Sequence, residues 1–136
     1  MLDITNFNSL INAAKQQDQP QKILVAFIEV YLPSQHNVSQ AKDFLAGTGG
    51  VLKPIQLVEK DPFQLYDLNS LAEESLTEQK NWKIALIGCL SGINGLMPNS
   101  QVTKKHKDSM IHKINSGADL SRYFAFHKNG DLLQLA

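Results

Sequence analysis

Two long apolar runs dominate the pattern of the chain. Residues 23–32 read Ile-Leu-Val-Ala-Phe-Ile-Glu-Val-Tyr-Leu, and residues 82–90 read Trp-Lys-Ile-Ala-Leu-Ile-Gly-Cys-Leu. Both runs are largely apolar at odd and even positions alike, which is typical of strands buried on both faces. They are predicted to form the centre of a sheet. Glu29, the one acidic residue in the first run, is expected at the rim; an inward position would require a cationic or backbone partner.

Apolar residues at helical spacing predict four helices beside these strands. The first two cover residues 7–14, with Thr5 as the N-cap, and residues 38–46. The third begins with Asp61 as the N-cap and a proline in the first helical position, and it continues to about residue 78. These segments therefore alternate with the predicted strands along the chain.

The fourth helix is predicted over residues 100–116. Val102, Met110 and Ile114 are expected to face inward, and Gly117 marks the C-terminal end of the helix. The remaining positions are mostly polar, so one side of this helix is expected to face solvent.

Two further segments have strand character. Residues 51–59 follow a strand pattern, and Pro54 favours an edge position because proline has no backbone N–H. The Asn-Gly pair at residues 129–130 separates short apolar runs at residues 123–127 and 132–135. This arrangement predicts a hairpin with a two-residue type I′ turn.

The predicted order of elements is α-β-α-β-α-β-α-β-β. We expect an α/β protein with a single domain over residues 1–136, in which helices flank a mixed sheet of about five strands that ends in a C-terminal hairpin. An α+β arrangement is the alternative. Because helices and strands alternate, crossover connections and a largely parallel sheet are favoured.

Charge is unevenly distributed along a chain whose net charge is zero. Residues 1–81 carry six lysines and ten acidic residues, whereas residues 82–136 carry seven basic residues and three aspartates. Such asymmetry can form an electrostatic binding face, unless folding interleaves the two halves. The single cysteine, the absence of a signal-peptide pattern and the absence of a long apolar run together predict a cytoplasmic protein without a membrane span.

A glycine-containing loop follows the second apolar run and precedes the fourth helix. It matches neither a P-loop, nor a dinucleotide-binding fingerprint, nor a nucleophile elbow. Backbone N–H groups at a strand–helix junction can bind anions, although the glycines also fit an ordinary turn. The candidate ligand-binding residues are Ser91, Gly92, Asn94, Gly95, Asn99, Ser100, Lys104 and Lys105.

The fourth helix places Lys104, Lys105, Asp108 and His112 on one face. This face is either a solvated surface or a binding edge for an anionic ligand or an acidic partner. No aromatic residues interleave with the lysines, so the pattern does not favour nucleic acid. His106 and His112 point in different directions around the helix, and no metal site is expected.

Cys89 lies at the end of the second apolar run, where its thiol could face the glycine loop. A nucleophilic thiolate requires a base or a cationic environment, and a histidine brought close by folding could supply one. The alternative is a small buried hydrophobic residue.

Glycines and apolar residues over most of the chain carry a family resemblance: Phe44-x-x-Gly-x-Gly-Gly-x-Leu-x-Pro, residues 82–92, Met110-Ile111-x-x-Ile114-x-x-Gly117, and Phe124-x-Phe126 with Gly130. This set resembles a group of short bacterial proteins, many labelled "ribonucleotide reductase subunit alpha". The resemblance implies a bacterial protein and assigns no activity or site residue. A reductase catalytic subunit resembles a much larger barrel with several essential cysteines, so the label does not fit a short chain with one cysteine.

The sequence contains no evident set of acid, base and nucleophile and no cofactor signature. We therefore expect a non-enzymatic binding or regulatory module for a small anionic ligand or a protein partner, without a cofactor. One alternative is a small enzyme that uses the loop at residues 91–99 with Cys89 or a histidine. Another alternative is a structural homo-oligomer.

Overall fold

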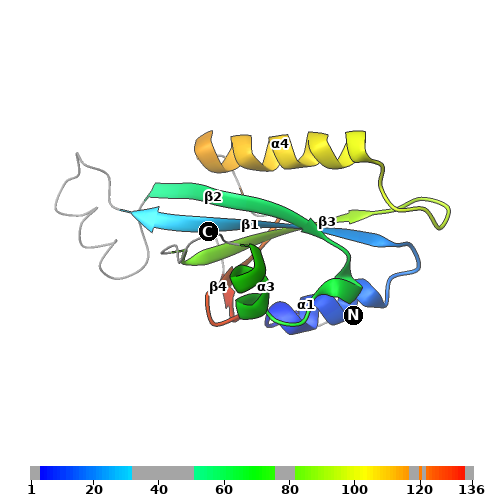
Figure 1. Ribbon diagram of the computed structural model, residues 1–136, viewed down its shortest axis with the longest axis horizontal. Coiled ribbons are helices and arrows are strands. Elements are labelled where there is room, and N and C mark those ends of the chain that lie inside the picture. The colour runs from blue at the N-terminus through cyan, green and yellow to red at the C-terminus, as the bar shows by residue number, and fades with distance from the viewer. Residues whose placement is uncertain (1–3, 32–50, 76–81, 117–119, 121, 134–136) are drawn as a thin grey trace.

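The two apolar runs form neighbouring strands in the middle of a five-stranded sheet (Figure 1). The computed structural model describes residues 4–31, 51–75, 82–116, 120 and 122–133. The predicted helix over residues 38–46 lies outside this part of the chain. In chain order, the described elements are α1 (Phe7–Lys15), β1 (Gln21–Tyr31), β2 (Val51–Lys60), the 3-10 turn η1 (Pro62–Gln64), α3 (Leu68–Ser75), β3 (Ile84–Ser91), α4 (Ser100–Ser116), β4 (Phe124–His127) and β5 (Leu132–Leu133).

The strand order is β2-β1-β3-β4-β5, and each neighbouring pair is antiparallel. The five-stranded sheet, its flanking helices and the C-terminal hairpin are confirmed, but the expected parallel pairing is wrong. Because β2 and β3 are both antiparallel to β1, they run parallel to each other, and η1 and α3 lie in the crossover between them. β1 lies between these two parallel strands. Helices and strands therefore alternate along the chain without placing parallel strands next to each other.

Helices cover both faces of the sheet, with α1 and α3 on one face and α4 on the other (Figure 1). Successive side chains of β1 alternate between these layers. Ile23 and Phe27 belong to the apolar cluster with α1 and α3, whereas Leu24 belongs to the cluster under α4. All residues from 23 to 28 are buried, as are residues 84–87 of β3. The prediction that both runs are central strands is therefore confirmed.

The edge position predicted for β2 is also confirmed. Pairing with β1 is irregular where Phe27 lies opposite Gln56 and Ile28 lies opposite Pro54, which leaves Ile55 as an extra residue on the edge strand. Next to this bulge, the half-buried Glu29 lies opposite Lys53, at the rim of the sheet. The bulge thus accommodates a proline without interrupting a central strand.

Two helix starts differ from the predictions. Asn6, rather than Thr5, caps α1, because its side chain accepts a hydrogen bond from the backbone N–H of Ser9. Asp61 caps a helical segment as predicted, but that segment is the short η1, after which Leu65 is extended. The chain restarts as α3 with Asp67 at its N-terminus, where its carboxylate accepts from the Ser70 N–H. The predicted continuous third helix is therefore wrong.

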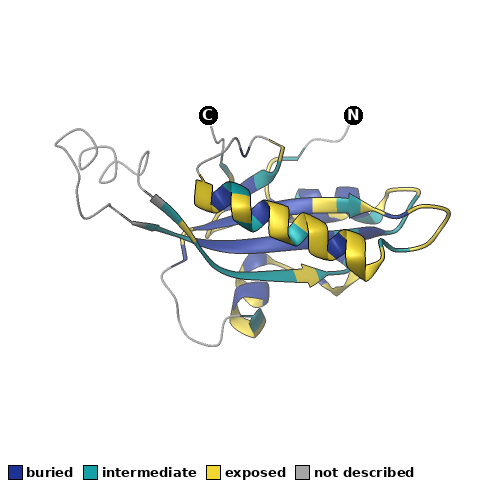
Figure 2. Ribbon diagram, turned by 90° about the horizontal axis from the view of Figure 1, so that it is seen from above, coloured by how far each residue is buried: buried dark blue, intermediate teal, exposed yellow. Residues whose placement is uncertain are grey.

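α4 covers residues 100–116 as predicted, and Figure 2 shows that only one side of it is buried. Met110 and Ile114 face the sheet, as expected. Val102 is exposed, however, and Thr103 is buried in its place. The Thr103 hydroxyl donates to the Asn99 carbonyl, so this buried hydroxyl has a hydrogen-bond partner in the first turn of α4.

The C-terminal hairpin forms, but its turn is not the predicted type I′. The Gly130 N–H donates to the His127 carbonyl, and the His127 N–H donates to the Asp131 carbonyl, which defines a three-residue loop. Only Gly130 in this loop has a positive φ, of 94°. The Asn129 side chain instead accepts from the Asp131 N–H, and this bond stabilises the longer loop.

Candidate functional site

The glycine loop after β3 contains a two-residue hairpin turn. Ile93 and Leu96 exchange two backbone hydrogen bonds, each with an N···O distance of 3.0 Å. Between them, Asn94 and Gly95 have φ values of 54° and 78°, as a type I′ turn requires. The sequence contains two Asn-Gly pairs, and this one adopts the turn that was predicted for the other.

Two further N–H groups of this loop donate to acceptors elsewhere in the protein. The Gly92 N–H donates to the Pro20 carbonyl at 2.7 Å, and the Gly95 N–H donates to the Gln19 side-chain oxygen at 2.8 Å. The Ser91 hydroxyl accepts from the Gln21 side chain at 3.1 Å. These contacts fasten the loop to the connection between α1 and β1, and they leave these N–H groups engaged rather than directed at a ligand.

The other predicted site residues belong to α4. The Asn99 side chain caps this helix by accepting from the Val102 N–H at 2.9 Å. Ser100, Lys104 and Lys105 are exposed. The predicted set thus divides into two groups, one fastened to the α1–β1 connection and one at the start and on the outer face of α4.

Cys89 does not have the surroundings of a nucleophile. Alternate residues of a strand point to the same face of the sheet, so Cys89 points the same way as Ala85 and Ile87 in β3. This is the face that carries α1 and α3. His106 and His112 lie on α4, across the sheet (Figure 1). Although Cys89 is an exposed residue, desolvation by the atoms around its sulfur raises the pKa of its thiol to about 11. The thiol therefore stays protonated at neutral pH.

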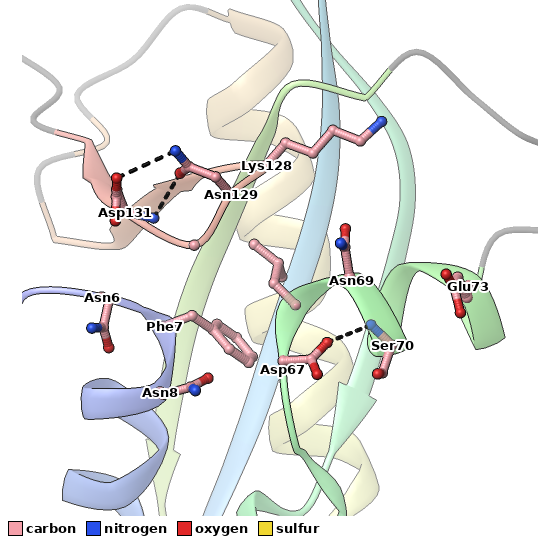
Figure 3. Close-up of a pocket in the computed structure, with 12 residues that line it drawn as sticks. Asn6, Phe7, Asn8, Asp67, Asn69, Ser70, Glu73, Lys128, Asn129 and Asp131 are labelled. Atoms are coloured by element: carbon pink, nitrogen blue, oxygen red, sulfur yellow. Dashed lines mark hydrogen bonds between the residues drawn. The ribbon is translucent and has the colours of Figure 1, made fainter.

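A polar cleft of about 380 Å³ lies at a place that the sequence did not indicate (Figure 3). Three segments that are distant in the chain form it: the first turn of α1, the first turns of α3, and the loop between β4 and β5. Its lining residues are Asn6, Phe7, Asn8, Asp67, Leu68, Asn69, Ser70, Glu73, Lys128, Asn129, Gly130 and Asp131. In the sequence, these polar residues are recognisable only as caps and turn residues.

Much of the polar lining of the cleft is occupied by local hydrogen bonds (Figure 3). Asp67 accepts from the Ser70 N–H at 2.7 Å, and hydrogen bonds from the backbone and hydroxyl of Ser70 lower the pKa of its carboxyl. Asn129 and Asp131 bind each other. The amino group of Lys128 lies 5.3 Å from the centre of the Trp82 ring. Helix capping and turn formation therefore account for the side chains of Asn6, Asp67, Asn129 and Asp131.

The cleft does not favour the anionic ligand predicted from the sequence. Three carboxylates line it, those of Asp67, Glu73 and Asp131, against the single cation of Lys128. An anion would be repelled by this excess of negative charge. Over the described residues, no group of three or more His, Cys, Asp or Glu side chains is arranged to hold a metal ion.

Comparisons of the chain with models of protein families, with curated proteins and with solved structures gave no match. Within the described part of the chain, no helix has the length and apolar character needed to cross a membrane.

Proposed function

We propose that this protein is a non-enzymatic binding module of the bacterial cytoplasm that recognises an acidic protein partner through the outer face of α4. Four lysines and one aspartate lie on this 17-residue helix. Lys104, Lys105, Asp108 and His112 are exposed on the face away from the sheet, where the two lysines outnumber the aspartate. Among the described residues, none of the α4 lysines has a carboxylate within 4.0 Å.

The opposite charge lies on the other side of the sheet. α3 contains Glu73 and Glu74 and no basic residue, and Asp67 precedes it. The described ion pair, between Lys60 and Glu74 at 2.8 Å, involves a glutamate of α3. The sheet therefore separates the positive helix from the negative one, and α4 is left to attract carboxylates from outside the chain.

A protein partner is favoured over a small anion because a helix face of this length offers an extended surface rather than an enclosed pocket. A small anion would use the N–H groups after Asn99 or those of the loop, and three of these N–H groups already have acceptors: Val102 donates to the Asn99 side chain, and Gly92 and Gly95 donate to Pro20 and Gln19. A binding function is favoured over catalysis because β3 directs the Cys89 side chain to the face of α1 and α3, whereas His106 and His112 lie on α4 across the sheet.

Charge reversal on α4 tests this function. Isotopically labelled protein is titrated with poly-glutamate, and backbone amide shifts are recorded by NMR. We expect saturable shifts along α4 that weaken as salt is added. The double variant Lys104→Glu, Lys105→Glu should bind about 2–30-fold more weakly, since exposed ion pairs contribute roughly 0.2–1 kcal/mol each.

The charge-matched control is the double variant Lys53→Glu, Lys83→Glu, which reverses two exposed lysines outside α4. It should bind poly-glutamate nearly as well as the wild type. Equal losses in both double variants would contradict a role specific to α4. Inorganic phosphate is titrated in parallel, and strong shifts at residues 92–101 would favour an anion-binding loop instead. Photo-crosslinking in bacterial cells from position 105 then identifies the partner.

A further inference from the structure

Both Asn-Gly pairs of the chain lie in exposed turns, and this exposes them to a modification that needs no enzyme. Asn94 and Asn129 are exposed, and each is followed by a glycine with positive φ. The backbone nitrogen of a glycine is poorly shielded because the residue has no Cβ. Asparagine is also among the residues that are chemically labile. The two pairs differ in the hydrogen bonds that hold their side chains and backbone.

The modification is deamidation through a cyclic imide. At the first pair, the Gly95 backbone nitrogen attacks Cγ of Asn94, so that a new N–Cγ bond forms. The bond between Cγ and Nδ2 breaks, and the side-chain nitrogen leaves as ammonia with the proton given up by the backbone amide. Water then opens the imide at either carbonyl, which yields aspartate or isoaspartate. The only co-reactant is water, and nothing is oxidised or reduced.

At the second pair, hydrogen bonds hold both reacting groups, the side-chain amide of Asn129 and the backbone nitrogen of Gly130. The Asn129 side chain donates to the Asp131 carboxylate at 3.2 Å and accepts from the Asp131 N–H at 3.0 Å. The Gly130 N–H donates to the His127 carbonyl at 2.8 Å, and the Gly130 carbonyl accepts from the Phe7 N–H at 2.9 Å. Attack at Asn129 therefore requires the loop to open against all of these bonds.

The first pair is held less firmly. Among the described residues, the Asn94 side-chain amide has no hydrogen-bond partner. The Gly95 N–H donates to a side chain, that of Gln19, whereas the Gly130 N–H donates to a backbone carbonyl. We propose that Asn94 is a site of spontaneous deamidation, and that the folded protein modifies it faster than Asn129. Gln19 slows this reaction because it occupies the attacking nitrogen.

The product would alter the connection between the loop and the rest of the fold. Either product adds a carboxylate at the tip of the turn. Isoaspartate also adds a main-chain carbon to a two-residue turn whose flanking residues, Ile93 and Leu96, are paired by two hydrogen bonds. The turn can then no longer present the Gly95 N–H to Gln19 in the same geometry.

Peptide mass spectrometry of aged protein tests the proposal. Wild-type protein is incubated in mildly alkaline buffer, once folded and once unfolded in urea, and deamidation at each asparagine is followed over time. The unfolded sample gives the intrinsic rates of the two pairs. We expect the ratio of the Asn94 rate to the Asn129 rate to be about tenfold higher in the folded protein, which corresponds to one or two net hydrogen bonds. An equal or lower ratio would overturn the proposal.

Two variants check the assigned contacts in the folded state, after circular dichroism has shown that each retains the wild-type unfolding midpoint. Gln19→Ala should accelerate deamidation of Asn94 and leave Asn129 unchanged. Asp131→Ala should accelerate Asn129 and leave Asn94 unchanged. A Gln19→Ala protein with an unaltered Asn94 rate would show that Gln19 does not protect the site.

Discussion

At the scale of single residues, glycines that look alike in the sequence serve different purposes. Gly92 is buried where the chain approaches itself, and a Cβ built there would lie 2.0 Å from the carbonyl oxygen of Leu96. Gly95 and Gly130 have open space around them, but their φ values of 78° and 94° disfavour any residue with a side chain. The sequence identifies these positions as turns, whereas the close approach at Gly92 depends on contacts that spacing does not reveal.

Substitution of Gly92 by alanine should therefore be costly. The added methyl group collides with backbone atoms, which cannot move aside as the end of a flexible side chain can. We expect a loss of about 1–3 kcal/mol in the free energy of unfolding, as in other overpacked sites, measured by urea denaturation. Gly95→Ala is the matched control, with a loss of about 1–2 kcal/mol from its dihedral angle alone. An unchanged stability in Gly92→Ala would contradict the described loop conformation.

Asp67 should make stability depend on pH. Hydrogen bonds from Ser70 lower the pKa of its carboxyl below the ordinary value of 3.8. Its contribution is therefore fully present above that value and is lost as the pH falls through the lower pKa of the folded state. Asp67→Asn keeps a good capping residue but removes the charge. We expect wild type to be more stable than this variant at neutral pH and equal to it in strong acid, as measured by urea denaturation at both pH values.

At the scale of elements, periodicity identified the long segments and failed where local hydrogen bonds decide between similar conformations. The runs at 23–32 and 82–90 and the helix at 100–116 contain enough apolar or helix-forming residues to determine their type. The Asn-Gly pairs were ambiguous because the residue that follows each pair differs. The Asp131 carboxylate accepts from the Asn129 side chain, and the Asp131 N–H donates back to it, which favours a three-residue loop. The apolar side chain of Leu96 cannot accept a hydrogen bond from Asn94, and the Leu96 backbone pairs with that of Ile93 instead.

Hydrogen exchange tests the arrangement of the strands. β1 is paired on both sides and its residues 23–28 are buried, so its amides should exchange only when the whole domain unfolds. The amides of α3, a helix of eight residues, should exchange faster by local opening. An NMR exchange series on the native protein measures both. Amides of Val25 and Leu86 that exchange as fast as those of α3 would contradict the central position of β1 and β3.

At the scale of the whole molecule, the charge asymmetry of the sequence has a spatial counterpart in the opposed helices α3 and α4. The candidate site was harder to predict, because it depends on which segments meet. The loop residues Ser91, Gly92 and Gly95 are fastened to Gln19 and its neighbours, which spacing along the chain could not indicate. The basic face of α4 was visible in the sequence because a helix places its residues at known angles.

The bulge in β2 has a consequence for crowded conditions. A flat edge strand is a template on which other chains can add strands and grow into fibres. Along Val51–Lys60, the missing N–H of Pro54 and the extra residue Ile55 break that template into two short stretches. At the opposite edge, the Leu132 N–H donates to the Thr5 carbonyl, so the chain covers that side itself. Along the described residues of β2 and β5, a second copy of this protein therefore finds no long row of free hydrogen-bonding groups on which to add a strand.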